Sequence, residues 1–84
     1  MTKLLYFAWV RQRTGVGEET VDLPAEVATV ADLIGWLKTR DEGYEHAFAN
    51  LDLIRAAINQ EHVPLDAKIE GAREIAFFPP VTGG

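Results

Sequence analysis

The sequence contains no cysteine, and its single methionine is the first residue. Disulfides, thiolate metal sites and nucleophilic thiols are therefore excluded. Basic residues are also few: eight Lys and Arg against thirteen Asp and Glu give a net charge of −5, which disfavours nucleic acid or an anionic membrane surface as the main partner. No apolar run approaches the ~20 residues of a membrane span, and no cleavage site of a signal peptide follows the start. These features predict a soluble, cytoplasmic protein.

The length of 84 residues accommodates one hydrophobic core. Hydrophobic residues make up 48% of the sequence and charged residues 25%, values typical of a folded domain. The core of so small a domain is marginal, and no disulfide reinforces it. We therefore expect most apolar groups to be buried, some of them by a partner protein.

Runs of aliphatic, aromatic and β-branched residues predict about five strands. Two glycines within residues 11–17 predict a turn, which would make the first two strands an antiparallel hairpin. A second turn is expected at 59–62. The predicted strands cover residues 3–10, 18–23, 53–59 and 74–78, with a short edge strand between 63 and 73.

The middle of the chain has the pattern of an amphipathic helix. Thr29 is a favourable N-cap, and Asp32 follows three residues later. Gly35 is expected to allow close packing on the sheet, and Gly43 to end the helix. Residues 44–51 could form a short second helix. The apolar side chains that share one helical stripe are Val30, Leu33, Ile34 and Leu37.

The order strand, strand, helix, strand, short strand, strand predicts an α+β fold. A mixed sheet with a helix across one face is the β-grasp, or ubiquitin-like, architecture. We place this domain at residues 1–78 and an extended tail at residues 79–84, because two consecutive prolines cannot pair regularly with a neighbouring strand.

Both faces of the first and last strands are apolar, although one helix covers only one face of a sheet. Two interpretations are open. Either segment 41–52 folds over the second face, or a partner protein covers it, with Phe7 and Phe78 as anchors. By alternation, the first strand divides into Leu4, Tyr6, Ala8 and Val10 against Lys3, Leu5, Phe7 and Trp9, and the last into Ile75 and Phe77 against Ala76 and Phe78.

No cluster of reactive side chains predicts a self-contained active site. His46 and His62 are the only imidazoles, and neither has a second ligand at metal-binding spacing. The glycine-containing segment 14–17 lacks the lysine of a phosphate-binding loop. We therefore expect this chain to bind no metal and no cofactor.

The tail carries the most informative pattern. Pro79 and Pro80 keep it extended, which lowers the entropy lost when it enters a partner, and six residues reach up to ~20 Å. Gly83 and Gly84 have no β-carbons and would let a terminal carboxylate pass through a narrow channel. A free carboxylate is a poor electrophile, so chemistry there requires activation, most simply by ATP as an acyl-adenylate. A terminal Gly-Gly is also compatible with an inert end.

The segments LLYFAWVR, AAINQ and AFFPPVTGG closely resemble the small subunits of molybdopterin synthase, over the whole chain. That family has the β-grasp fold. The resemblance implies that a ubiquitin-activating-like adenylyltransferase uses ATP to adenylate Gly84, and that a sulfur donor converts the adenylate into a thiocarboxylate. This chain would then be the non-catalytic sulfur donor of the synthase, with the catalytic lysines and an anion pocket on the large subunit.

The resemblance also implies partners and site residues. Two small and two large subunits would form a heterotetramer, in which the tail delivers sulfur to cyclic pyranopterin monophosphate to make molybdopterin. Gly84 would bear the sulfur, and Gly83, which has no side chain, would let the end of the tail pass through a narrow channel. At His62 we expect the family to have an apolar residue, so His62 is not included in the predicted interface. The predicted partner-binding residues are Phe7, Arg11, Phe78, Pro79, Pro80, Val81 and Thr82.

Two other hypotheses fit the same tail. The chain could be a protein modifier or a sulfur carrier of another pathway, such as thiamine synthesis, tRNA thiolation or the tungsten cofactor. It could also be a plain interaction domain whose tail is inert. The net charge of −5 would suit docking against basic partners.

Overall fold

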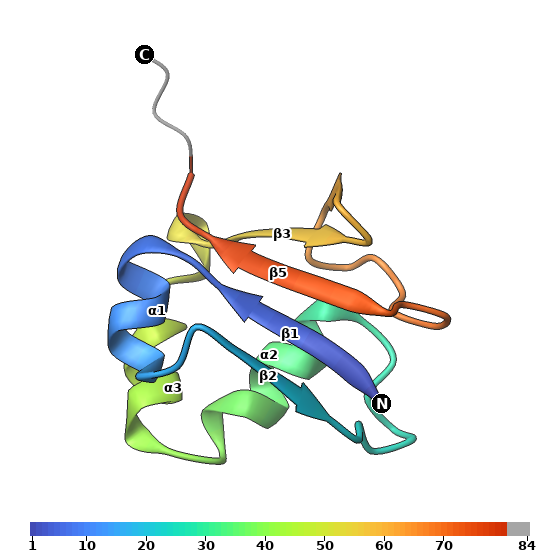
Figure 1. Cartoon of the computed structure of the whole chain (residues 1–84), viewed down its shortest axis with the longest axis horizontal. Helices are drawn as coiled ribbons and strands as arrows, with labels where there is room; N and C mark the ends of the chain where they lie inside the picture. Colours follow the sequence, from blue (N-terminus) through green and yellow to red (C-terminus); the bar gives the residue numbers. More distant parts are fainter. Residues whose placement is uncertain (81–84) are drawn as a thin grey trace.

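Five strands form one mixed sheet in the computed structural model, which describes residues 1–80 (Figure 1). They are β1 (Thr2–Tyr6), β2 (Glu18–Val21), β3 (Arg55–Ile58), β4 (Glu61–Val63) and β5 (Glu74–Phe78). Their spatial order is β2-β1-β5-β3-β4. β1 and β5 pair in parallel, whereas the other three pairings are antiparallel. The strand that leads into the tail therefore lies at the centre of the sheet.

Three helices and one 3-10 turn complete the described fold. They are α1 (Ala8–Thr14), α2 (Val30–Lys38), α3 (Glu42–Ala47) and η1 (Leu51–Leu53). Buried side chains from all three helices share one core with the inward-facing residues of the sheet. This arrangement confirms the predicted β-grasp architecture. No helix within residues 1–80 is long and apolar enough to cross a membrane.

The capping residues and the apolar stripe of α2 are confirmed. The Asp32 backbone N–H donates to the Thr29 hydroxyl oxygen at 3.1 Å, and the Thr29 N–H donates back to the Asp32 carboxylate at 3.1 Å. All four residues of the predicted stripe are buried. The expectations for two glycines are wrong, because Gly35 is exposed with open space beside it and Gly43 lies inside α3.

The predicted first strand is too long. It ends at Tyr6, and the apolar run continues directly into α1, whose Val10 is fully buried. Alanine, arginine and glutamine favour this helix, and Gly15, at φ +85°, ends it in the left-handed conformation. The turn expected at 11–17 is thus confined to the residues after α1. Strand alternation no longer applies beyond Phe7. Ala8 is exposed and Trp9 packs against the core, so their predicted faces are wrong, whereas Val10 lies in the core with Leu4 and Tyr6 as grouped.

Most of the remaining elements lie close to their predicted positions. The edge strand is the exception, because β4 (Glu61–Val63) begins within the turn expected at 59–62 and ends where the short edge strand was expected to begin. β1 and β2 are antiparallel as expected, although a helix rather than a tight turn connects them. The turn between β3 and β4 is made by Asn59 and Gln60, both at positive φ (50° and 72°), as a two-residue hairpin requires. β5 has the predicted bounds, and α3 realises the predicted short second helix, beginning at Glu42.

Segment 41–52 belongs to the main core. Its Phe48 ring is fully buried and lies edge-on to Phe77, with centroids 5.1 Å apart, and it also contacts Tyr6. Tyr6 and Phe77 are paired in register and face the side of the sheet that α2 covers. The interpretation that this segment covers the second face is therefore wrong. On that face Phe7 is exposed and Leu5 and Phe78 are partly buried, whereas the small side chains of Ala57 and Ala76 are buried.

Candidate functional site at the base of the tail

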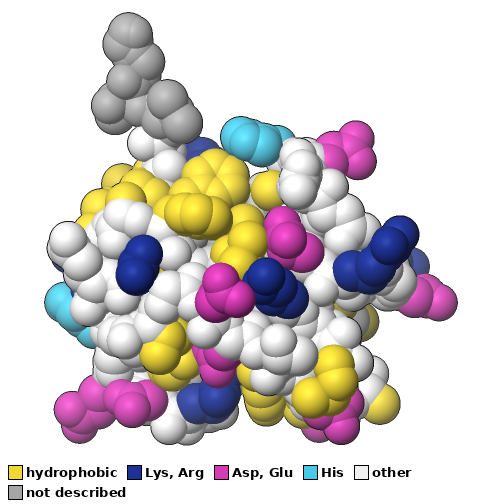
Figure 2. Space-filling model, in the orientation of Figure 1, with side chains coloured by type: hydrophobic (Ala, Val, Ile, Leu, Met, Phe, Trp, Pro, Cys, Tyr) yellow, Lys and Arg dark blue, Asp and Glu magenta, His cyan; other side chains and the backbone are white. Residues whose placement is uncertain are grey.

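The sheet face opposite the helices carries an apolar patch where β1 and β5 end. The strand registers place Leu5 beside Ala76 and Ala76 beside Ala57, so these side chains point away from the core. Figure 2 shows hydrophobic side chains gathered over the upper part of this face, with charged side chains below them. We call the following residues the outer apolar patch: Leu5, Phe7, Ala57, Ala76 and Phe78.

Phe7 is held in the outer apolar patch by its backbone. It continues the extended conformation of β1 (φ −125°, ψ 156°), and its N–H donates to the Phe77 carbonyl at 3.1 Å. The next residue, Ala8, has φ +53° and turns the chain into α1. The Phe7 side chain is consequently 48% exposed, an unusual position for a large apolar ring.

Phe78 ends β5 and is partly buried. It pairs in register with Arg55 of β3, and its ring lies 5.1 Å from the His62 ring of β4. Pro79 and Pro80, which follow directly, are also partly buried. The first two residues of the tail therefore begin at the edge of the outer apolar patch.

Arg11 adds a cation beside the patch. It is exposed on α1, and its guanidinium lies so close to Gly17 that a β-carbon there would be 3.0 Å from the Arg11 Cζ. Arg11, Phe7 and Leu5 together line a shallow groove of about 490 Å³. An exposed aromatic ring, a second ring that is partly buried, a cation and a stiff chain exit are features of a surface that docks onto another protein.

A family model described as the ThiS family matches residues 4–84. The chain belongs to the ThiS family. It is 37% identical to the molybdopterin synthase sulfur carrier subunit of Escherichia coli K12, over 100% of both chains. The protein of the same name from Dictyostelium discoideum is 37% identical over 98% of this chain and 94% of its own. These relatives confirm the resemblance expected from the sequence.

Solved structures agree with the ThiS-family fold. SAMP1 of Haloferax volcanii superposes with a TM-score of 0.74 at 27% identity, covering 99% of this chain and 98% of that one. The likeness therefore extends over almost the whole domain, sheet and helices together.

Several predicted site residues of this ThiS-family domain come together in the structure. Phe7 and Phe78 share the outer apolar patch, and Arg11 lies at its border. Val81, Thr82, Gly83 and Gly84 lie outside the described residues. The partner-binding role of all these positions stays a prediction.

Sequence reasoning missed other members of the patch. In LIRAAIN, alternation places Ala57 on the same face as Arg55, a signal that was present but weak because alanine contributes little surface. Leu5 was assigned to the second face but not singled out. His62 was left out because a polar ring stands where an apolar residue was expected from the resemblance. Its proximity to Phe78 depends on the pairing of three strands, which the sequence alone does not show.

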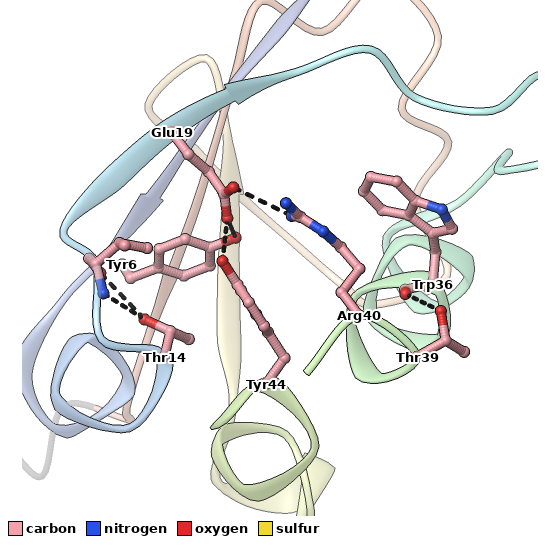
Figure 3. A network of polar contacts seen from close by, with 8 residues as sticks. Tyr6, Thr14, Glu19, Trp36, Thr39, Arg40 and Tyr44 are labelled. Carbon is pink, nitrogen blue, oxygen red and sulfur yellow. Dashed lines mark hydrogen bonds and ion pairs between the residues drawn. The ribbon is translucent and has the colours of Figure 1, made fainter. Parts of the chain in front are cut away.

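A polar network on the core side anchors α3 to the sheet of this ThiS-family domain (Figure 3). The Glu19 carboxylate accepts hydrogen bonds from the Tyr44 hydroxyl at 2.6 Å, the Tyr6 hydroxyl at 2.9 Å and the Arg40 guanidinium at 3.1 Å. The Arg40 guanidinium also lies over the Trp36 and Tyr44 rings. One carboxylate therefore joins β2 to β1, to α3 and to the segment between α2 and α3.

The network shifts the titration of its members. Burial raises the pKa of Tyr6, and the hydrogen bond to Glu19 raises it further. Burial followed by the same hydrogen bonding raises the pKa of Tyr44 to about 12. For Glu19, burial alone would raise the pKa, but hydrogen bonds from Tyr44, Tyr6 and Arg40 outweigh it and lower the pKa below its usual value. The tyrosines thus stay protonated as donors while Glu19 stays ionised.

Proposed function

We propose that this ThiS-family protein is the sulfur carrier subunit of a molybdopterin synthase and acts in molybdenum cofactor biosynthesis. One observation carries the proposal: the likeness to a protein of that name extends over 100% of both chains. The outer apolar patch adds support, because it provides a docking surface where the tail leaves the sheet.

The proposed chemistry takes place on the carboxylate of Gly84. A ubiquitin-activating-like adenylyltransferase joins this carboxylate to the AMP part of ATP and releases pyrophosphate. A sulfur nucleophile then attacks the activated carbonyl and displaces AMP, which leaves a thiocarboxylate. Because the chain contains no cysteine, the sulfur is carried on the terminal carbonyl rather than on a side-chain thiol.

Transfer then takes place in the synthase. The outer apolar patch docks on the large subunit. The tail, which its prolines keep extended and its glycines keep narrow, enters the active site of that subunit. The thiocarboxylate sulfur bonds to a carbon of cyclic pyranopterin monophosphate, and a carbon–oxygen bond of that same carbon breaks, so that the oxygen leaves. Water then cleaves the glycyl carbon–sulfur bond, which leaves the sulfur on the substrate and regenerates the carboxylate. Molybdopterin carries two such sulfurs, so each product requires two transfers. The proposed assembly of two small and two large subunits is what the family resemblance implies.

Reconstitution tests this function. The full chain is incubated with the adenylyltransferase, ATP and a sulfide source, and intact mass spectrometry is expected to show the gain of one sulfur-for-oxygen exchange. Addition of the large subunit and cyclic pyranopterin monophosphate is then expected to yield molybdopterin. The matched control is Gly84→Ala, which leaves the described domain untouched and is expected to abolish product formation. Product formation by Gly84→Ala would refute the tail mechanism.

A second candidate is a protein modifier that uses the same activated tail. The likeness to SAMP1 of Haloferax volcanii, described as a small archaeal modifier protein, favours it. The same experiment separates the two candidates. A thiocarboxylate that yields no molybdopterin, together with lysine-linked adducts in the cognate cell extract, would favour the modifier.

A further inference from the structure

His62 is an exposed ring at the margin of the outer apolar patch. It lies on β4, the edge strand of the sheet, and is paired in register with Ala57. Its ring centroid is 5.1 Å from that of Phe78, with the planes tilted by 51°. One side of the imidazole is thus supported by Phe78, and the rest is open to whatever docks there.

Within the described residues, the charges around His62 offer it no acidic partner. On β3, the outward-facing charge near Phe78 is Arg55, a cation. Glu74 of β5 is paired with Lys3 in the register, at the opposite end of the strand, and Glu61 neighbours His62 in sequence and so points to the other face. No ion pair found within residues 1–80 includes His62.

We propose that His62 belongs to the docking surface and contacts the partner as an uncharged ring, so that docking selects the neutral imidazole. The inference rests on the proposed function and names the large subunit as the partner. The continuity of His62 with the outer apolar patch supports the inference, because its ring touches Phe78, the residue from which the tail leaves. Burying a charged imidazolium between Phe78 and a partner, without a carboxylate beside it, would cost more than burying the neutral ring.

The consequence is a dependence of docking on pH, because a histidine side chain changes its charge between about pH 5 and 8. The dissociation constant of the full chain and the large subunit is measured by calorimetry at about pH 7.5 and about pH 5.5. Binding of the natural chain is expected to be roughly tenfold weaker at the lower pH. At the higher pH, His62→Leu is expected to bind at least as tightly as the natural chain. Its affinity is expected to change less with pH, because the contribution of His62 is gone.

His62→Arg fixes the charge, and we expect it to bind at least about tenfold more weakly at both pH values. The matched controls are His46→Leu and His46→Arg, which alter the exposed histidine of α3, and both are expected to retain the affinity and pH profile of the natural chain. Urea unfolding of every variant verifies that the fold is intact; His62 is exposed, so little change is expected.

Two results would overturn the inference while the natural chain still binds. One is an identical pH profile for His62→Leu and the natural chain, and the other is equal or tighter binding by His62→Arg. Absence of any binding between the natural chain and the large subunit would instead refute the proposed function. The two failures are thereby distinguished.

Discussion

The backbone N–H of Phe7 donates a hydrogen bond to the carbonyl of Phe77, across the parallel pairing of β1 and β5. This bond fixes the end of β1 beside the end of β5. The backbone of Phe7, whose ring is exposed, is therefore held beside Phe78, the next residue of β5. Two aromatic side chains that are far apart in sequence are thus brought by the backbone into one outer apolar patch.

Phe78→Ala is expected to weaken docking to the large subunit at least about tenfold, because aromatic anchors next to the centre of an interface dominate binding energies. Since Phe78 is only partly buried, the free energy of unfolding should fall by less than that for a core ring. The control is Phe77→Ala, whose fully buried ring should cost about 3–5 kcal/mol of stability. Calorimetry and urea unfolding measure the two effects. Unchanged affinity of a folded Phe78→Ala would remove Phe78 from the interface.

Glu19→Gln is expected to lower the free energy of unfolding at neutral pH by about 1–3 kcal/mol, because the charged acceptor of three hydrogen bonds is lost. The folded state holds the pKa of Glu19 below its unfolded value, so its contribution is present above that value and is lost as the solution is acidified. The natural chain should therefore lose more stability than Glu19→Gln as the pH falls from about 5 to about 3.

Urea unfolding across that pH range measures this difference. The neighbouring Glu18 supplies the control, since its carboxylate is exposed and pairs only with Lys3 at 3.3 Å. Surface ion pairs contribute ~0–1 kcal/mol, so Glu18→Gln should leave the stability nearly unchanged. Parallel pH profiles for the natural chain and Glu19→Gln would show that the network does not depend on the charge of Glu19.

Gly35 and Gly43 form a matched pair of helical glycines with opposite surroundings. A β-carbon at Gly35 meets nothing within 4 Å, so Gly35→Ala should raise the free energy of unfolding by about 0.5–1 kcal/mol. A β-carbon at Gly43 would lie 2.7 Å from the Arg13 carbonyl oxygen, which belongs to the backbone of α1. Gly43→Ala should therefore destabilise the domain by about 1–3 kcal/mol. Thermal unfolding measures both, and a neutral Gly43→Ala would mean that α1 and α3 separate without cost.

Elements whose signals are local could be predicted from the sequence. The cap at Thr29 and Asp32 and the stripe of α2 lie within nine residues, and β5 is bounded by a charged residue and prolines. The boundary at Phe7 could not be predicted in this way, because seven consecutive apolar and aromatic residues have no break in pattern where strand becomes helix. The left-handed Ala8 that makes the break has no mark in the sequence.

The candidate site was predictable in part for the same reason. Phe7 and Phe78 follow from alternation along single strands. The contact of His62 with Phe78 depends on pairings that join β4, β3 and β5 across the sheet, which local patterns do not encode. The close approach of α1 and α3 at Gly43 is likewise a long-range contact, and sequence reasoning assigned the packing role to Gly35 instead.

The central position of β5 has a mechanical consequence. A partner that draws the tail into its active site pulls along the axis of this strand, which is bonded to β1 on one side and to β3 on the other. Such a pull loads the hydrogen bonds of both ladders in shear, all at the same time, rather than opening them one after another. The domain is therefore expected to resist such a pull as one unit, because tension on the tail is distributed over the whole sheet and β5 does not detach from its end.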